Sequence, residues 1–389
     1  MCELNVAFID DGINEEIIIS EKHTFYHYIF DNGVIIETKK TTKDPLSHGT
    51  LCAKMFIEFA PSCNIYDVNI PTTKNNNMNF NDINVALKWC TNNKIHLISM
   101  SLGVLSMSDE LELKKCIEKL EKNGTILVAT CSNTNKVTYP ASLPNVMGVR
   151  YDRCNILKSG EYYYLDEPID GIDIITSLPK EQPLNFYKEK YGIDVLLTNS
   201  FATPYIASKI CFYLSRGMNL NSIKDEIKRN SKKIENNILY TYYEKCILNF
   251  QQPDLLDIPI IGVVSRNQEE NHICEKLHKT FRNNGYLCGL LSDESDILNI
   301  KFLKKLAYKY DISINQLVTL IINSNVLDLL LISINDNELK NMLSEKLIDV
   351  VLKPTEMPLL LKCENIINYS VCYDIEKVYN EILNVFNSK

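Results

Sequence analysis

The sequence has no long uninterrupted run of hydrophobic residues. Its best candidate, residues 326–334, is much shorter than the roughly 20 apolar residues that a membrane-spanning helix needs, and Asp328 interrupts it. The first five residues lack the basic start and the apolar core of a secretory signal peptide. We therefore expect a cytoplasmic protein with no membrane partner.

The sequence also lacks a basic block and a metal-binding cysteine pattern. Its 41 Lys and Arg are outnumbered by 49 Asp and Glu, which gives a net charge of −8, so we expect no nucleic-acid partner. The 13 cysteines form no CxxC pair, which indicates reduced, mostly buried thiols. His23 and His27 have a spacing that could bind a metal on a helix, but nearby carboxylates are not arranged to complete a site, so surface or partly buried histidines are favoured. We predict no metal and no cofactor.

Short apolar stretches alternate with amphipathic helices through the first 235 residues. Such alternation predicts an α/β domain built on a doubly wound, mostly parallel sheet. Residues 14–45 fit this pattern poorly and are expected to be irregular apart from one short strand. The expected strands are 5–9, 33–37, 64–70, 96–103, 126–129 and 171–177, and the expected helices are 81–92, 222–234 and those starting at 48, about 109 and 200.

Polar residues fall where three of these elements begin or end. Asp10 follows the first strand and precedes a glycine turn, His48 starts an apolar helix, and Ser200 lies at the mouth of a buried helix with Pro204 in its first turn. Each has an ordinary alternative: Asp10 could be a turn residue, and Ser200 could be a helix N-cap. A helix N-terminus beside Ser200 would also favour an oxyanion forming there.

Five segments together carry a family resemblance. They are Val6-Ala7-Phe8-Ile9-Asp10-Asp11-Gly12, His48-Gly49-Thr50-Leu51-Cys52-Ala53, Ser101-Leu102-Gly103, residues 127–133 and Asn199-Ser200-Phe201-Ala202-Thr203-Pro204. In this order they resemble the aspartate, histidine, substrate-binding, oxyanion and serine segments of the subtilisin-like serine peptidases. The resemblance covers roughly residues 4–235 and implies a sheet of subtilisin-like type.

The resemblance implies a role for each matching residue. Ser200 would be the nucleophile, His48 the general base, and Asp10 the group that orients the imidazole. Asp11 stands where the family usually has Thr or Ser, so Asp10 is the expected triad acid. Asn133 would donate its side-chain amide to the oxyanion together with the Ser200 backbone N–H. The implied substrate-binding residues are Ser101, Leu102, Gly103, Ala129, Thr130 and Thr138, the last near the base of a reduced S1 wall formed by the short segment 133–139.

The sequence departs from the family pattern at a few positions. Thr198-Asn199 replaces the usual Gly-Thr before the serine, and Ser132 replaces the usual Gly before the oxyanion asparagine. Neither change removes a catalytic atom, although both could alter the local turns. Cys52 lies one turn beyond His48, as in the thiol-bearing branch of the family, which predicts sensitivity to mercurials.

Two expectations about function follow from the resemblance. The peptidase-like region begins within a few residues of Met1, with no prosegment of the kind that inhibits secreted relatives. We therefore expect a selective cytoplasmic processing peptidase that acts on a peptide or protein, such as leader removal from a ribosomally made precursor peptide. The alternative is a catalytically silent peptide-binding protein on the same fold.

A second domain is expected after a linker. The peptidase-like domain is assigned to residues 1–250, the linker to 251–258 and a smaller Rossmann- or P-loop-like α/β domain to 259–389. Residues 262–268 match neither GxxxxGK[ST] nor GxGxxG, which disfavours nucleotide binding and a nucleotide-driven regulator. A recognition or homodimerisation module is preferred, with His272 and His278 on its surface.

Overall fold

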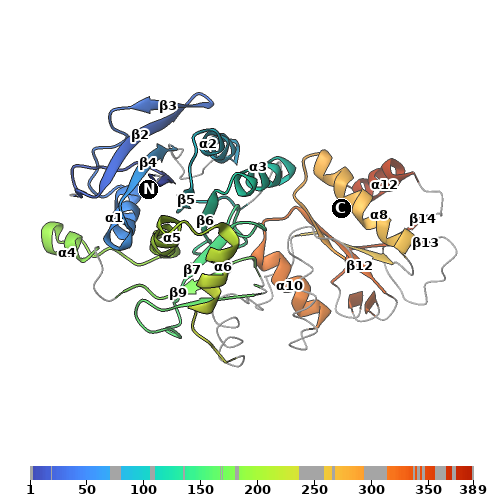
Figure 1. Ribbon diagram of the computed structural model, residues 1–389. Helices are drawn as coiled ribbons and strands as arrows, with labels where there is room; N and C mark the ends of the chain where they lie inside the picture. The colour runs from blue at the N-terminus through green and yellow to red at the C-terminus, as the bar shows by residue number, and fades with distance from the viewer. Residues whose placement is uncertain are drawn as a thin grey trace. The chain divides into compact units, whose positions relative to one another are not determined.

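The chain divides into two compact units, Met1–Ile247 and Leu248–Lys389. The linker predicted at 251–258 lies almost entirely outside the described residues. The computed structural model (Figure 1) describes residues 3–18, 20–70, 80–105, 110–134, 136–166, 168, 170–179, 184–235, 258–264, 268–292, 313–335, 338–339, 342–343, 347–354, 365–369 and 374–387.

The first unit is built on a nine-stranded sheet of order β3-β2-β4-β1-β5-β6-β7-β9-β8. Neighbouring strands are parallel except for the pairs β2–β3 and β8–β9 at its two edges. This confirms the predicted mostly parallel α/β sheet. The strands are β1 (Asn5–Asp10), β2 (His23–Asp31), β3 (Val34–Thr38), β4 (Cys63–Asn69), β5 (Leu97–Met100), β6 (Ile126–Thr130), β7 (Met147–Tyr151), β8 (Tyr162–Tyr164) and β9 (Ile174–Thr176).

Helices cover both faces of this sheet (Figure 1). Val6 and Phe8 of β1 belong to the core that contains α1 and α5, while the alternate residues Ala7 and Ile9 are buried on the opposite side. Helices α1 and α5 pack against each other, as do α2 and α3. The helices are α1 (His48–Phe59), α2 (Phe80–Asn92), α3 (Glu110–Lys122), α4 (Asn185–Tyr191), α5 (Asn199–Ser215) and α6 (Leu220–Arg229).

Three local predictions for this unit are wrong. Residues 23–31 were expected to be irregular but form the nine-residue strand β2, where aromatic residues suit a pleated surface. The helix predicted over 222–234 is α6, which ends at Arg229 with Asn230 as its C-cap. Cys154 is disulfide-bonded, so the expectation of reduced thiols fails there; cysteine spacing alone does not reveal pairing.

The second unit has a five-stranded sheet of order β11-β12-β10-β13-β14, and all its paired strands are parallel. Two helices, α8 and α12, contribute to the core on one face of the sheet. The elements are β10 (Ile260–Val264), α8 (Gln268–Asn283), β11 (Cys288–Leu291), α10 (Ile314–Ser324), β12 (Leu329–Ile334), β13 (Val350–Pro354), β14 (Ile366–Tyr369) and α12 (Ile375–Asn387).

The two histidines of α8 differ in their surroundings. His272 is exposed, as expected. His278 is buried, and its Nε2 lies 3.0 Å from the backbone oxygen of Cys288, so its predicted surface position is wrong. It lies on the same buried side of the helix as Cys274, Leu277 and Phe281. The segment predicted to lack a phosphate loop, 262–268, lies partly outside the described residues.

Candidate active site

Asp10 and His48 are brought together by a strand end and a helix start. Asp10 is the last residue of β1 and only 3% exposed, and His48 is the first residue of α1. The His48 Nδ1 atom lies 2.8 Å from Asp10 Oδ1 and 3.0 Å from Oδ2. A carboxylate can only accept hydrogen bonds, so Nδ1 must carry the proton, and Nε2 is left as the acceptor when the ring is neutral.

The neighbouring carboxylate, Asp11, has a different task. It accepts hydrogen bonds from the backbone N–H groups of His48 (3.1 Å) and Gly49 (2.7 Å). These are unpaired donors at the start of α1, so Asp11 fixes the helix end that carries His48. Gly49 must also be small, because a Cβ there would lie 2.6 Å from the Gly12 carbonyl oxygen. The two carboxylates thus have different partners: Asp10 contacts the His48 ring, and Asp11 contacts the backbone at the start of α1.

Ser200 lies in the first turn of α5, which packs against α1. The residue is 9% exposed, and the ring of the following Phe201 is centred 5.7 Å from the His48 ring. Among the described residues, the structure shows no hydrogen bond from Ser200 Oγ to His48. The backbone carbonyl of Ser200 accepts a hydrogen bond of 3.0 Å from Ser101 Oγ, which ties the serine turn to the end of β5.

The Cys52 thiol lies between these elements. Its Sγ is 3.8 Å and 3.9 Å from the two ring nitrogens of His48 and 3.8 Å from the Ser200 carbonyl oxygen. The side chain is completely buried, and burial raises the pKa of the thiol. Within the described part of the chain, Asp10, His48 and Cys52 form the one cluster whose donor atoms could converge on a metal ion.

The pKa of His48 is shifted by two opposing effects. Burial lowers it, but the adjacent Asp10 carboxylate and Cys52 act against burial, and the pKa lies well above its usual value. A protonated imidazole is stabilised by Asp10, which is what a general base requires as it takes up a proton.

Asn133, the expected oxyanion donor, is held through its oxygen atoms. Its Oδ1 accepts hydrogen bonds from Arg153 Nη2 (2.6 Å) and the Asn199 backbone N–H (3.2 Å), and its backbone oxygen accepts one from Arg153 Nη1 (2.8 Å). The structure thus places the Asn133 side chain beside the residue that precedes Ser200. Sequence reasoning missed Arg153, since no local pattern links an arginine after β7 to a loop 20 residues earlier.

Asn199 and Ser132, two of the residues that depart from the family pattern, contact each other. Asn199 Nδ2 donates a hydrogen bond of 2.8 Å to the Ser132 carbonyl, and Asn199 Oδ1 accepts one of 3.0 Å from the Tyr151 N–H. Asn199 therefore joins the serine turn to both the Asn133 loop and the end of β7.

The remaining predicted substrate-binding residues fall into two groups. Leu102 and Gly103 are half-buried beyond the end of β5, and a Cβ on Gly103 would lie 2.7 Å from Thr138 Cγ2. Thr138 is buried, and its hydroxyl accepts a 2.7 Å hydrogen bond from the Ser132 N–H. Ala129 and Thr130 are buried in β6.

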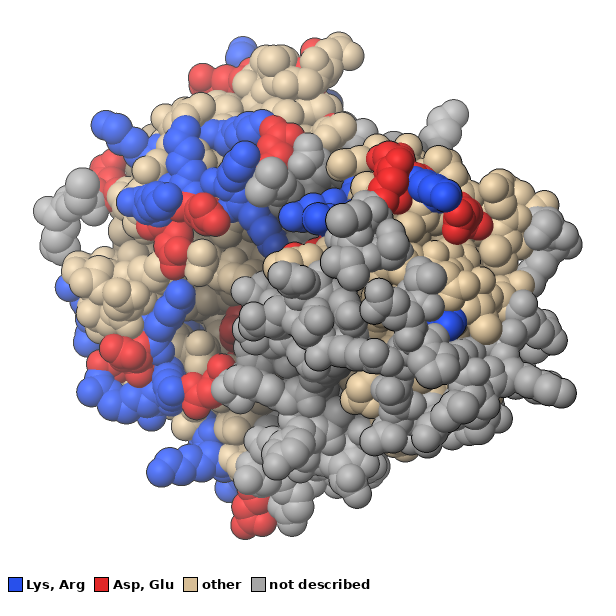
Figure 2. Space-filling view, turned by 90° about the vertical axis from the view of Figure 1, so that its right-hand side faces the viewer, with Lys and Arg blue, Asp and Glu red and all other residues tan. Residues whose placement is uncertain are grey.

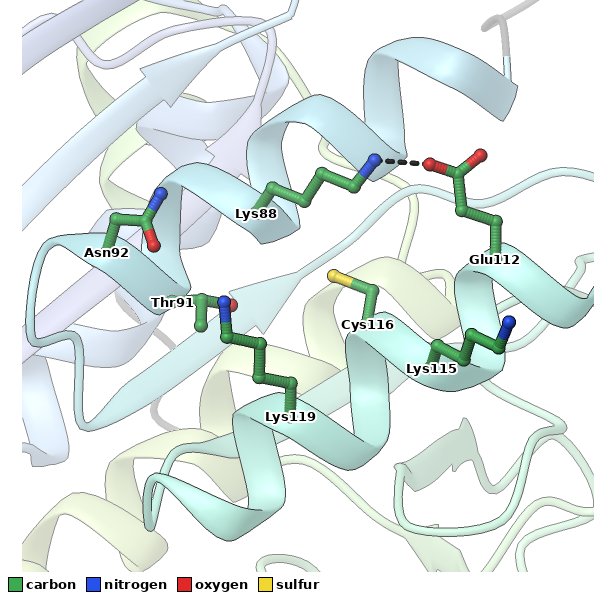
Figure 3. Close-up of a pocket in the computed structure, with 7 residues that line it drawn as sticks. All are labelled: Lys88, Thr91, Asn92, Glu112, Lys115, Cys116 and Lys119. Carbon is green, nitrogen blue, oxygen red and sulfur yellow. Dashed lines mark hydrogen bonds and ion pairs between the residues drawn. The ribbon is translucent and has the colours of Figure 1, made fainter.

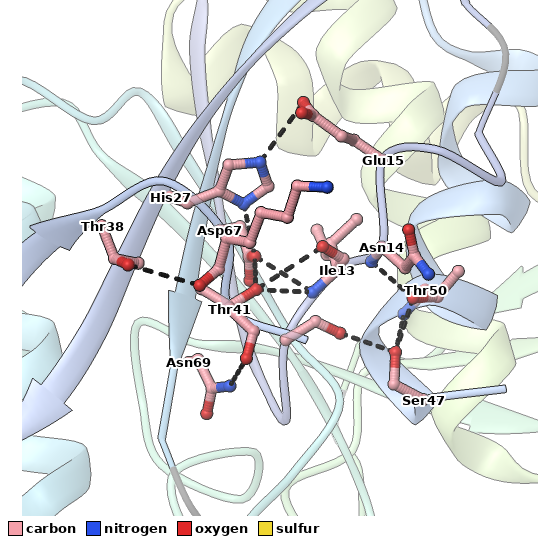
Figure 4. A network of polar contacts seen from close by, with 12 residues as sticks. Ile13, Asn14, Glu15, His27, Thr38, Thr41, Ser47, Thr50, Asp67 and Asn69 are labelled. Atoms are coloured by element: carbon pink, nitrogen blue, oxygen red, sulfur yellow. Dashed lines mark hydrogen bonds and ion pairs between the residues drawn. The ribbon is translucent and has the colours of Figure 1, made fainter. Parts of the chain in front are cut away.

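A second histidine–aspartate pair stabilises the loop behind the site (Figure 4). His27 Nδ1 lies 2.9 Å from Oδ2 of Asp67, a fully buried residue of β4. The same Oδ2 accepts hydrogen bonds from the Ile13 N–H (3.0 Å) and the Thr41 hydroxyl. His23 and His27, whose spacing could bind a metal on a helix, lie instead in strand β2, and both are more deeply buried than expected.

A pocket of about 310 Å³ lies between α2 and α3 (Figure 3). Lys88 of α2 forms an ion pair with Glu112 of α3 at its mouth. Figure 2 shows one face of the molecule, on which Lys and Arg side chains gather with Asp and Glu among them. The pocket has the same mixture of charges: its lining is Lys88, Thr91, Asn92, Glu112, Lys115, Cys116 and Lys119.

Within the described ranges, no helix is both long and apolar enough to cross a membrane.

Part of this unit is similar to known proteins. Residues 3–155 match the model described as "Subtilase family"; this segment includes Asp10, His48 and Asn133 and ends before Ser200. A thermostable alkaline protease of Halalkalibacterium halodurans is 28% identical over 185 residues, which cover 46% of this chain and 48% of that protein. The major intracellular serine protease of Bacillus subtilis is 26% identical over 168 residues, which cover 40% of this chain and 48% of that protein.

This chain therefore spans about half the length of these two curated relatives. Among solved structures, a lanthipeptide protease is similar with a TM-score of 0.41 and 16% identity, covering 57% of this chain and 77% of that chain.

Proposed function

We propose that the first unit of this chain is a serine endopeptidase of the subtilase family, whose model matches residues 3–155. The observation that carries the proposal is the Asp10–His48 hydrogen bond of 2.8 Å at the end of β1, with the Ser200 turn of α5 packed beside it. An imidazole held in one tautomer by a buried carboxylate, next to a serine at a helix start, is the arrangement that acyl transfer requires.

Each residue would have a defined role in this reaction. His48 Nε2 would take the proton from Ser200 Oγ as the oxygen attacks the carbonyl carbon of the peptide, and would then give it to the leaving amine. Asp10 would stabilise the imidazolium that forms. The Asn133 amide and the Ser200 N–H, an unpaired donor of the first turn of α5, would stabilise the tetrahedral oxyanion. Water would then hydrolyse the acyl-enzyme by the same route.

The substrate is proposed to be a restricted set of peptides, such as a ribosomally made precursor peptide that loses its leader. Thr138, near one end of the short segment 133–139, supports this proposal because it is buried and its hydroxyl is bonded to the Ser132 N–H. A homodimer through the second unit is proposed as well; light scattering of the full chain tests it.

A cytoplasmic location is part of the proposal. The relative titled "Major intracellular serine protease" supports it. The disulfide at Cys154 is evidence against it, because such bonds are rare in the cytosol.

A catalytically silent peptide-binding protein is the second candidate. The observation in its favour is that Ser200 Oγ makes no hydrogen bond to His48 among the described residues, while the Cys52 thiol lies within 3.9 Å of both ring nitrogens. Catalytic hydrogen bonds are often long before substrate binds, so this geometry does not remove His48 as the base.

The test is a digest of a peptide mixture, read by mass spectrometry, with wild-type protein and two variants. Ser200→Ala removes the proposed nucleophile. Ser215→Ala is the matched control, because Ser215 is exposed at the other end of α5 and bonds only to the Phe212 carbonyl among the contacts described. We expect cuts that persist in Ser215→Ala and vanish in Ser200→Ala. A few cut sites with common flanking residues support a processing peptidase, and many unrelated sites contradict it. Folded wild type that cleaves nothing supports the binding protein.

A further inference from the structure

The Asn133 side chain is positioned by donors only. Arg153 Nη2 and the Asn199 N–H both point hydrogen atoms at Oδ1, at 2.6 Å and 3.2 Å. A guanidinium and a backbone N–H cannot accept a hydrogen bond, so the amide oxygen must face them. The NH₂ group of Asn133 is then directed away from both, and no partner for it is found among the described residues.

The orientation of the Asn133 amide determines whether this side chain can stabilise an oxyanion. The two ends of an asparagine amide are nearly equal in shape, so packing alone distinguishes them poorly. In one orientation the NH₂ group donates to a developing oxyanion. In the reversed orientation an oxygen would face the oxyanion and repel it, and the NH₂ group would face the positive charge of Arg153. A donor that is already oriented needs no rearrangement when the negative charge forms.

Arg153 is itself held in place by the turn that follows β7. Buried Asp152 accepts hydrogen bonds from the N–H groups of Cys154 (3.1 Å) and Leu157 (2.8 Å), which shape this turn. The guanidinium then reaches across to the Asn133 loop with two nitrogens, Nη1 to the backbone oxygen and Nη2 to the side-chain oxygen. Such a two-point contact fixes both the loop and the amide, which a single ammonium would do less well.

We propose that Arg153 is a positioning residue for the oxyanion site: its two hydrogen bonds hold Asn133 with the amide NH₂ directed toward the reacting carbonyl. This inference rests on the proposed peptidase function. It assigns to Arg153 no contact with the substrate and no transfer of a proton. It predicts that Arg153 affects turnover only through Asn133.

The experiment is a double-mutant cycle on a peptide substrate found in the digest. Single variants Arg153→Met and Asn133→Ala, their combination, Arg153→Lys and the control Arg229→Met are compared by kcat and KM. Arg229 is the matched control, an exposed arginine on α6 whose ion-pair partner among the described residues is Glu226. Loss of an oxyanion asparagine costs about 10²–10³-fold in kcat, a magnitude known from subtilisin, so Asn133→Ala should fall in that range.

We expect Arg153→Met to lower kcat by about 10-fold or more, within the limit set by Asn133→Ala, with KM changed by less than about 3-fold. In the Asn133→Ala background the same substitution should have almost no further effect on kcat. Arg153→Lys should recover part of the loss, and Arg229→Met should match the wild type.

Two results would overturn the inference while leaving the peptidase intact: an unchanged kcat in Arg153→Met, or losses that simply add in the double variant. A wild type that neither cleaves peptides nor reacts with a fluorophosphonate at Ser200 would overturn both proposals. The two failures are therefore distinguishable.

Discussion

Substitution of Asp67 should reveal how strongly the loop behind the site depends on one buried carboxylate. In Asp67→Ala, the His27 ring and the Ile13 N–H lose the acceptor that they contact at 2.9 Å and 3.0 Å. Thr41 also loses a partner, but its hydroxyl lies 3.5 Å from the Ile13 carbonyl and can turn toward it. The Ile13 N–H keeps a hydrogen bond of 3.1 Å to Thr41 Oγ1, so the buried His27 Nδ1 is the donor left without its acceptor.

The magnitude follows from these contacts. A buried donor without a partner costs about 1–3 kcal/mol, and removal of one member of a buried ionic pair costs about 3–5 kcal/mol. Because Asp67 is fully buried, we expect the free energy of unfolding to fall by about 3–5 kcal/mol. Asp67→Asn, which retains an acceptor oxygen, should lose less.

The unfolding of the first unit can be followed by tryptophan fluorescence. It has one tryptophan, Trp89, whose ring is centred 4.5 Å from Tyr28 of β2 and 6.2 Å from Tyr66 of β4. Tryptophan fluorescence during urea unfolding therefore reports on the first unit alone and on the strands that hold the His27–Asp67 pair. A probe confined to one unit avoids treating a chain of two units as a single two-state system.

The stability that Asp67→Ala loses should depend on pH. Burial lowers the pKa of His27, but Asp67 and Glu15 outweigh burial and raise it above its usual value. A raised folded pKa stabilises the protein below the unfolded pKa, and this contribution disappears as pH rises through the folded pKa. The loss of unfolding free energy in Asp67→Ala should therefore be larger at a pH of about 6 than at a pH of about 9.

Glu15→Ala is the control, because Glu15 lies 3.3 Å from the other His27 nitrogen but is 41% exposed. An exposed ion pair contributes about 0–1 kcal/mol, so this variant should lose much less stability. A deficit below about 1 kcal/mol for Asp67→Ala, or equal deficits for both variants, would show that the buried acceptor does not have the importance assigned to it.

The remaining predictions concern His48, the proposed general base, and its neighbours. His48 can act as base only when neutral and its pKa is raised, so kcat/KM should rise with pH through a pKa above 6.5; a midpoint below 6.5 contradicts this. Asp10→Asn should lower kcat by up to about 10⁴-fold, as in the corresponding chymotrypsin-type variant, because the wrong tautomer is favoured; an unchanged kcat would remove Asp10 from the triad. A mercurial that reaches the buried Cys52 thiol should abolish hydrolysis, and Cys52→Ala should resist it; equal inhibition of both proteins would place the reactive thiol elsewhere.

The elements that carry the candidate site could be predicted from the sequence. β1 is an uninterrupted apolar run that ends at Asp10, and α5 is a mostly buried helix whose apolar residues begin beside Ser200. Buried strands and helices leave strong local signals, since their residues must be apolar at the right spacing. The separation of Asp10 from Asp11 was also predictable, because the family pattern distinguishes the two positions.

The sequence-based predictions were wrong where polar residues are buried. β2 has the sequence His-Thr-Phe-Tyr-His-Tyr-Ile-Phe-Asp, with no regular alternation of polar and apolar residues. Its buried His27 is tolerated because Asp67, 40 positions away, compensates for it. His278 is similar, since its partner is a backbone oxygen of the next strand. A polar residue is predicted at the surface whenever its partner is distant in the sequence.

The contacts around Asn133 show why departures from a family pattern should not be judged one at a time. Read separately, Ser132 and Asn199 each replace a residue that the family uses to shape a turn. In the structure Asn199 bonds to the Ser132 carbonyl at 2.8 Å, and its own N–H bonds to Asn133 Oδ1, the atom that Arg153 also contacts. Asn199, which the usual pattern does not have, thus connects the Ser200 turn to the loop that holds Asn133. The contact with Ser132 uses its backbone carbonyl, so it is the change at Asn199 that adds this connection.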